Sequence, residues 1–170
     1  MAHNLESNSS SMYPINKKEC YKLVASQLRS LFEGDNYLIP NLSNTSAILN
    51  QAMPTINWVG FYLIKNNALL LGPFQGKVAC VHIPIGKGVC GSAVEKDKTI
   101  LVEDVHEFPG HIACDSASQS EIVIPIHYNN EVVGVLDIDS PILSRFDKED
   151  QEGLEEVVRI LENLCDWTSL

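Results

Sequence analysis

The spacing of hydrophobic and polar residues predicts helices at both ends of the chain. Apolar side chains recur every three or four positions over residues 17–33 and 42–53, and Gly34 and Pro54 mark where these segments end. A third amphipathic helix is predicted over residues 147–167, with acidic residues in its first turn. The apolar stripes of the first and third helices are Tyr21, Val24, Leu28, Leu31 and Phe32, and Leu154, Val157, Val158, Leu161, Leu164 and Cys165.

Between these helices the pattern changes to the alternation that is typical of strands. Asparagine pairs at 66–67 and 129–130 are the turns of two predicted hairpins. This order of elements predicts an α+β fold, an antiparallel sheet with helices on one side. Residues 1–14 are predicted to be a disordered tail, and residues 15–170 a single domain. The predicted strands cover residues 56–65, 68–71, 99–102, 121–128 and 131–140.

The first predicted strand has two aromatic residues on one face. With a period of two, Trp58 and Tyr62 lie on the same side as Gly60. These aromatic residues are either part of the core or, beside a glycine, the wall of a pocket.

The last predicted strand places two carboxylates beside valines. An exposed sheet face would explain Asp137 and Asp139, but the surrounding Val, Ile and Leu residues argue against full exposure. Glu121 begins a similarly apolar strand. The shared face of the last strand comprises Val133, Val135, Asp137 and Asp139.

Three of the five cysteines lie in the glycine-rich and polar middle of the chain. Cys80, Cys90 and Cys114 are ten and twenty-four positions apart, spacings of neither a CxxC motif nor a zinc finger. These thiols are therefore either incidental or able to exchange bonds with one another. Cys90 falls in the first turn of a short helix predicted over residues 89–95, where the helix dipole favours a thiolate. Cys114 lies in a loop, residues 106–120, that is expected to be exposed.

Composition limits the partners of such a domain. The 22 acidic and 12 basic residues give a formal charge of −10, which argues against nucleic acid or an anionic membrane and favours a ligand with a cationic group. No apolar run approaches the roughly 20 residues that span a bilayer, and residues 1–11 lack the apolar core of a signal peptide. The odd number of cysteines fits a reducing cytosol, where disulfides are transient and catalytic, so a cytoplasmic protein is expected.

Seven segments of the chain match a known family. They are residues 56–62 (INWVGFY), 71–80 (LGPFQGKVAC), 88–91 (GVCG), 103–106 (EDVH), 110–115 (GHIACD), 120–125 (SEIVIP) and 134–140 (GVLDIDS). In these segments the chain resembles the free methionine-(R)-sulfoxide reductases, single-domain enzymes built on the GAF fold. The resemblance extends from about Lys17 to the last helix. It is specific because three cysteines at the family's spacing occur together with three acids.

The resemblance implies roles for the thiols. A thiolate attacks the sulfoxide sulfur, an acid protonates the departing oxygen, and a second thiol converts the resulting sulfenic acid into a disulfide, which thioredoxin or a similar dithiol reduces. Carried over by position, Cys114 is the attacking thiol, Cys80 the resolving thiol and Cys90 an auxiliary or second resolving thiol. The position of Cys90 at a helix terminus argues instead that Cys90 is the more acidic thiol, so the roles within the trio stay open.

The resemblance also implies a substrate pocket. Trp58 and Tyr62 resemble the wall around the substrate's methyl and thioether groups. Glu121 and Asp139 resemble the acids that meet the sulfoxide oxygen, and Asp137 the acceptor of the substrate's ammonium. Crowded carboxylates raise one another's pKa, so that one can stay protonated, and no metal or organic cofactor is expected. Similar proteins are homodimers, and a homodimer is expected here.

Two other functions compete with this one. A GAF-like module could sense a small ligand without turnover, or a redox sensor could use its disulfide as the output. Three thiols are more than a ligand sensor needs. Repeated turnover of free methionine sulfoxide would distinguish an enzyme from both sensors.

Overall fold

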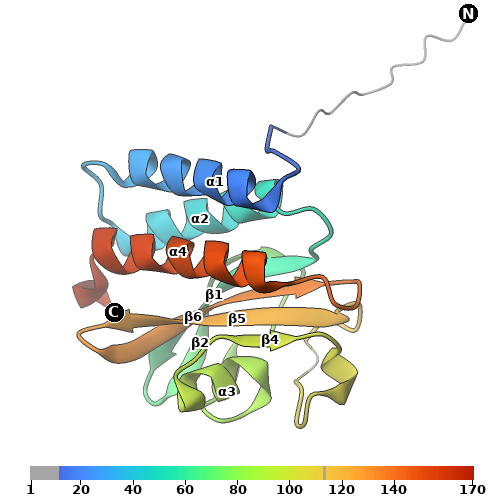
Figure 1. The fold of residues 1–170 in the computed structure, drawn as a ribbon. Coiled ribbons are helices and arrows are strands. Elements are labelled where there is room, and N and C mark those ends of the chain that lie inside the picture. The colour runs from blue at the N-terminus through green and yellow to red at the C-terminus, as the bar shows by residue number, and fades with distance from the viewer. Residues whose placement is uncertain (1–11, 113) are drawn as a thin grey trace, which may run out of the picture.

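A six-stranded antiparallel sheet forms the centre of the computed structural model, which describes residues 12–112 and 114–170 (Figure 1). The spatial order of the strands is β3-β2-β1-β6-β5-β4. The central pair, β1 and β6, therefore has neighbours on both sides. The strands are β1 (Trp58–Lys65), β2 (Ala68–Gly76), β3 (His82–Pro84), β4 (Ile100–Val102), β5 (Ser120–Tyr128) and β6 (Glu131–Ser140).

Helices cover both faces of this sheet, in unequal numbers. Figure 1 shows α1 (Lys17–Phe32), α2 (Leu38–Ala52) and α4 (Lys148–Leu164) on one face and α3 (Gly88–Lys96) on the other. The predicted α+β fold is confirmed, as is the placement of the N- and C-terminal helices on one side. The short helix α3, on the opposite face, departs from the expectation that all helices share one side. Two short 3-10 helices are also present, at Val105–Glu107 and Trp167–Ser169.

Each face of the sheet has its own hydrophobic core. The larger core lies under α1, α2 and α4 and contains alternate residues of the strands, such as Phe61 and Leu136. The smaller core lies on the α3 face and contains Trp58, Tyr62 and Cys90. Because strand residues alternate between these cores, the residues of one strand face build the α3 side.

The two N-terminal helices are close to their predicted ranges. Asn16 caps α1, its side chain accepting a hydrogen bond from the Glu19 backbone at 3.0 Å. Leu31, assigned to the buried stripe, is 48% exposed. Helix α2 begins at Leu38 rather than at residue 42, because Pro40 lies in its first turn, where a backbone N–H has no intrahelical partner.

The last helix is shorter than predicted at both ends. Asp147 caps it and forms a capping box with Asp150, so the helix begins at Lys148. It ends at Leu164, because Cys165 adopts an extended backbone. Leu164 is 39% exposed and does not belong to the buried stripe, whereas the predicted packing of Cys165 is correct.

Both asparagine turns form hairpins as predicted. Asn66, Asn67, Asn129 and Asn130 all have positive φ, between 51° and 63°, as a tight turn between antiparallel strands requires. The strands depart from the predicted pattern at two places. The first is β2, which continues past Leu71 to Gly76 and shifts its register with β1 around Gly72 and Pro73.

The second irregularity lies in β6. The β5–β6 register shifts between Ile126 and His127, so Val133 is an extra residue in the ladder. Val133 therefore packs against the larger core, and the prediction that it shares a face with Val135, Asp137 and Asp139 is wrong.

The remaining expectations concern the tail and the loop. Most of the predicted tail, residues 1–11, lies outside the described residues, and the domain boundary stays a prediction. Tyr13 is buried, at 6% exposure, and its hydroxyl donates to Gln27 at 2.9 Å. In the described part of the loop, Cys114 is exposed as expected, whereas Ser118 and Ser120 are buried. In the described part of the chain, none of the helices has the length and apolar character needed to cross a bilayer.

His127 joins elements from both faces of the sheet. Its Nε2 lies 2.6 Å from an Asp97 carboxylate oxygen at the end of α3, and its Nδ1 lies 3.3 Å from a Glu162 oxygen on α4. Partial burial disfavours the imidazolium, but these two carboxylates outweigh it and raise the pKa of His127 above its ordinary value of 6.5.

This arrangement predicts a pH-dependent contribution to stability. Because the folded pKa is the higher one, the stabilisation is complete below about pH 6.5 and is lost as the pH rises through the folded pKa. The melting temperature of His127→Gln should therefore lie further below that of the wild type at pH 6 than at pH 9. The variant His82→Gln, which removes an exposed histidine, is the control. A gap that stays the same at both pH values would contradict this account of His127.

Candidate active site

A pocket on the α3 face of the sheet brings together distant parts of the chain. Residues of β1, β5, β6, the first turn of α3 and the loop after β4 line it, and its cavity volume is about 40 Å³. Cys80 lies next to this group, bonded to Cys114. The sequence-predicted residues that line the pocket are Trp58, Tyr62, Cys90, Cys114, Glu121, Asp137 and Asp139.

Strand pairing explains why three acids meet here. Asp137 and Asp139 are two residues apart on β6, so both side chains project from the same face. Glu121 on β5 pairs directly with Asp139, and Trp58 on β1 pairs with Asp139 from the other side. Directly paired residues have neighbouring side chains, so the register alone gathers the aromatic residue and the acids.

The acids are held in an environment that opposes their ionisation. Glu121 and Asp137 are only 5% and 6% exposed. Burial raises the pKa of Glu121, Asp137 and Asp139 well above the ordinary range, and repulsion between neighbouring carboxylates raises it further. No described residue hydrogen-bonds one Asp137 oxygen, Oδ1. A buried acceptor without a partner favours a ligand that brings a donor or a positive charge.

Cys90 does not have the properties expected of a helix-terminus thiol. It lies in the first turn of α3, as predicted, but it is only 3% exposed. Burial, followed by the charges of Asp137 and Glu121, raises the pKa of Cys90 well above its ordinary value. The prediction that the helix dipole makes this thiol acidic is therefore wrong, because burial first, and then the neighbouring acids, oppose the thiolate.

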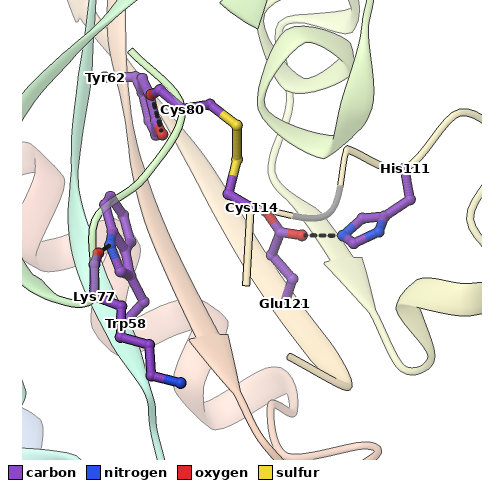
Figure 2. The surroundings of a disulfide bond; sticks show 7 residues. All are labelled: Trp58, Tyr62, Lys77, Cys80, His111, Cys114 and Glu121. Carbon is purple, nitrogen blue, oxygen red and sulfur yellow. Dashed lines mark hydrogen bonds and ion pairs between the residues drawn. A yellow bond between two sulfur atoms is a disulfide. The ribbon is translucent and has the colours of Figure 1, made fainter. Parts of the chain in front are cut away.

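The aromatic residues form a stacked wall. The Trp58 ring stacks on Tyr62 at 5.9 Å between centroids and on Phe74 of β2 at 5.2 Å. Hydrogen bonds fix both polar ends: the indole N–H of Trp58 donates to the Lys77 carbonyl at 3.1 Å, and the Tyr62 hydroxyl donates to the Cys80 carbonyl at 2.9 Å (Figure 2). The two sequence interpretations are thus both correct, because Trp58 and Tyr62 belong to a core and line the pocket.

A disulfide between Cys80 and Cys114 lies beside the pocket (Figure 2). The two Cα atoms are 5.8 Å apart, although the residues are separated by 34 positions. Cys114 is an exposed residue and Cys80 is half-buried. The sequence had left incidental thiols and bond exchange open, and this bond shows that at least two of the thiols meet.

Polar contacts hold the loop of Cys114 in place. The Asn57 amide donates to Asp115 and to Ser118, each at 3.1 Å. The other Asp115 oxygen accepts the Ala117 backbone N–H at 2.9 Å and lies 3.8 Å from the Lys77 ammonium. These contacts connect the loop both to the start of β1 and to the segment that carries Cys80.

His111 and Ser118 are among the pocket residues that were not predicted from the sequence. His111 Nε2 lies 3.5 Å from a Glu121 carboxylate oxygen (Figure 2), and burial lowers the pKa of His111. Ser118 is buried, lines the pocket and accepts a hydrogen bond from the Asn57 amide at 3.1 Å. His111 lies in one of the segments that match the family, and Ser118 lies between two of them. In a polar loop, however, the sequence has no periodic pattern that would distinguish a pocket-lining histidine or serine from an exposed one.

One group of pocket residues has the donors of a metal site. Potential ligand atoms of Cys90, Glu121 and Asp137 all lie within 4.8 Å of one another, and all three residues are buried. Within residues 12–112 and 114–170, this is the one such cluster of three or more His, Cys, Asp or Glu residues.

Comparisons with known proteins agree with the fold and with the family that the sequence resembles. The family model described as "GAF domain" matches residues 17–164. The free methionine-R-sulfoxide reductase of Escherichia coli is 49% identical over 154 residues, which cover 91% of this chain and 93% of that protein. The reduced form of fRMsr from Staphylococcus aureus is 56% identical, with a TM-score of 0.83 over 86% of this chain and 95% of that one. The free methionine-R-sulfoxide reductase of Neisseria meningitidis, solved in complex with its substrate, is 44% identical, with a TM-score of 0.85 over 88% and 90% of the two chains.

Proposed function

The chain belongs to the free methionine-R-sulfoxide reductase family of GAF domain proteins, and on this basis we propose that it reduces free L-methionine-(R)-sulfoxide to L-methionine. The observation that carries the proposal is the Cys80–Cys114 disulfide beside a pocket of three acids and two aromatic residues. This is the product state expected of a thiol-dependent reductase.

The first step requires the Cys114 thiolate and one of the pocket acids. The Cys114 thiolate attacks the sulfoxide sulfur while a carboxylic acid, Glu121 or Asp139, donates a proton to the oxygen. The sulfur–oxygen bond of the substrate breaks, methionine forms, and Cys114 becomes a sulfenic acid. Cys80 then displaces the sulfenic hydroxyl as water, which leaves the disulfide. A dithiol protein of the thioredoxin type returns both thiols by exchange.

The environment of the acids supports their part in this step. A carboxylic acid donates a proton only if it is protonated at working pH, and burial together with neighbouring carboxylates raises the pKa of Glu121 and Asp139. Asp137 has the buried oxygen without a partner, which suits the ammonium of a free amino acid. The wall of Trp58 and Tyr62 suits the methyl and thioether groups.

Burial supports Cys114 rather than Cys90 as the attacking thiol. The raised pKa of Cys90 disfavours its thiolate. The Cys90 sulfur also lies near Asp137 and Glu121, whose carboxylates repel the negative charge of a thiolate. Cys114, in contrast, lies on an exposed loop. We assign Cys90 to an auxiliary or second resolving role.

The small cavity implies that the loop moves during the cycle. With the disulfide formed, about 40 Å³ holds roughly three water molecules, far less than an amino acid. We infer that the loop of Cys114 opens after reduction and that the disulfide-bonded enzyme excludes substrate. A homodimer and a cytoplasmic location complete the proposal.

Gly60 provides a test of the aromatic wall. A Cβ atom at this position would lie 2.3 Å from Phe74 Cβ and 2.8 Å from Trp58 Cη2. Gly60→Ala should therefore displace the wall, lowering kcat/KM for the free sulfoxide by about tenfold or more and the unfolding free energy by about 1–3 kcal/mol. Gly34→Ala is the control for a loss of stability alone: its site has open space but a φ of 77°, so it should lower the unfolding free energy and leave the kinetics unchanged. Unchanged kinetics in Gly60→Ala would remove the wall from the proposed mechanism.

The function itself is tested by turnover. The protein is incubated with free L-methionine-(R)-sulfoxide, thioredoxin, thioredoxin reductase and NADPH, and methionine is quantified. An enzyme forms many equivalents of methionine per chain, and NADPH is consumed in parallel. A ligand sensor forms none and a redox sensor at most one, and either result would contradict the proposal.

A further inference from the structure

The cluster of Cys90, Glu121 and Asp137 places a buried thiol beside two of the pocket acids. Its ligand atoms lie within 4.8 Å of one another, and the three residues are 3%, 5% and 6% exposed. In the proposed reaction Glu121 or Asp139 supplies a proton and Asp137 binds an ammonium, whereas the Cys90 thiol has an auxiliary role and no assigned contact with the substrate. The Asp137 oxygen without a partner, to which the substrate ammonium is assigned above, is also a position where a metal cation can bind.

The donor set indicates which cation fits. One thiolate sulfur, two carboxylate oxygens and a nearby imidazole are ligands of zinc, whereas magnesium and calcium select oxygen donors alone. His111 Nε2 lies 3.5 Å from a Glu121 oxygen but outside the group of mutually close atoms, so it becomes the fourth ligand only after its side chain moves further into the pocket.

The distances are compatible with such a site. Zinc bonds of about 2.0–2.3 Å in a tetrahedron place the ligand atoms roughly 3.3–3.8 Å apart. Side-chain shifts of about 1 Å close the present cluster to that size. An ion also fits the small cavity, which a whole amino acid does not.

We propose that Cys90, Glu121, Asp137 and His111 form a zinc-binding site in the pocket, and that zinc bound there inhibits the enzyme. Binding displaces the thiol proton and the carboxyl protons, so the divalent ion is met by three anionic ligands. The inhibition rests on the proposed function, because the ion would occupy the positions of the substrate ammonium and of the acid's proton. The binding does not rest on it.

Binding is tested on the disulfide-bonded protein, in which Cys80 and Cys114 have no free thiols. After treatment with a chelator, the protein is titrated with zinc against a chromogenic competitor. Wild type should bind one zinc per chain, and Cys90→Ser and Asp137→Asn should each weaken binding by at least about tenfold. Cys20→Ser and Cys165→Ser, which remove buried free cysteines elsewhere, are matched controls and should bind as wild type. Cobalt should give a thiolate charge-transfer band that disappears only in Cys90→Ser.

Inhibition is tested in a single turnover of pre-reduced, desalted protein, because added dithiols bind zinc. Zinc should slow methionine formation in wild type, and added substrate should relieve the effect. Absent binding, or binding unaffected by Cys90→Ser, would overturn the site even if the reductase activity is found. Bound zinc that does not slow turnover would overturn the inhibition. Zinc binding in a protein that forms no methionine would leave the site in place and remove the proposed function.

Discussion

Substitution of Cys114 by serine is expected to abolish the reduction of free methionine sulfoxide with every reductant. A serine hydroxyl neither attacks the sulfoxide sulfur as a thiolate does nor forms a sulfenic acid, so the first step has no nucleophile. Cys90 should not replace it, because burial and the adjacent acids raise its pKa. The measurement is methionine formed per chain, first in a single turnover of reduced protein and then with thioredoxin or a small dithiol.

The matching Cys80→Ser variant separates the two thiol steps. It should still form about one equivalent of methionine per chain, since attack by Cys114 is intact, but it should cycle poorly with thioredoxin because no disulfide forms with Cys80. If Cys114→Ser keeps its full single turnover and Cys90→Ser has none, Cys90 is the attacking thiol. If none of the three substitutions matters, the reductase mechanism itself is wrong.

Local sequence was sufficient to predict the two hairpins that build the site, although β3 and the part of β2 after Leu71 were not predicted. The asparagine turns accept positive φ and so set the pairing of both hairpins. Once β5 pairs with β6, alternation brings Glu121 opposite Asp139 and places Asp137 on the same face. The candidate acids and aromatic residues could therefore be proposed as one group from local patterns and the family resemblance.

Features that depend on packing between distant segments could not be predicted in this way. The position of Cys90 in a helix was correct, but its acidity depends on acids more than thirty residues away in sequence, which the local pattern does not reveal. The bulge at Val133 reverses its side chain without any glycine or proline at that position to signal it. His111 reaches Glu121 only because the loop folds back over the pocket. In each case the deciding interaction is between segments that the sequence does not place together.

Asp137→Asn is expected to narrow the enzyme's preference for a free amino acid over an N-acetylated one. Asp137 is buried, and its Oδ1 has no partner among the described residues, so the ammonium of a free substrate can satisfy it. An N-acetylated or peptide-bound methionine sulfoxide has no such charge. In wild type it would not form the buried ion pair with Asp137, a loss of roughly 3–5 kcal/mol by analogy with broken buried ion pairs. That corresponds to a factor on the order of a hundred or more in kcat/KM.

The same pocket should select one epimer at sulfur. With the methyl group against Trp58 and Tyr62, only one epimer directs its oxygen at Glu121 and Asp139 while its sulfur faces the thiol, and the family resemblance identifies it as R. The measurement is kcat/KM for the free R sulfoxide, the free S sulfoxide and the N-acetylated R sulfoxide, on wild type and Asp137→Asn. The variant should lose mainly its rate on the free R form, so that the free and acetylated substrates become similar, while discrimination against the S epimer persists because Glu121 and Asp139 are intact. Similar wild-type rates on the free and acetylated R forms would refute this role of Asp137 and leave the thiol chemistry unaffected.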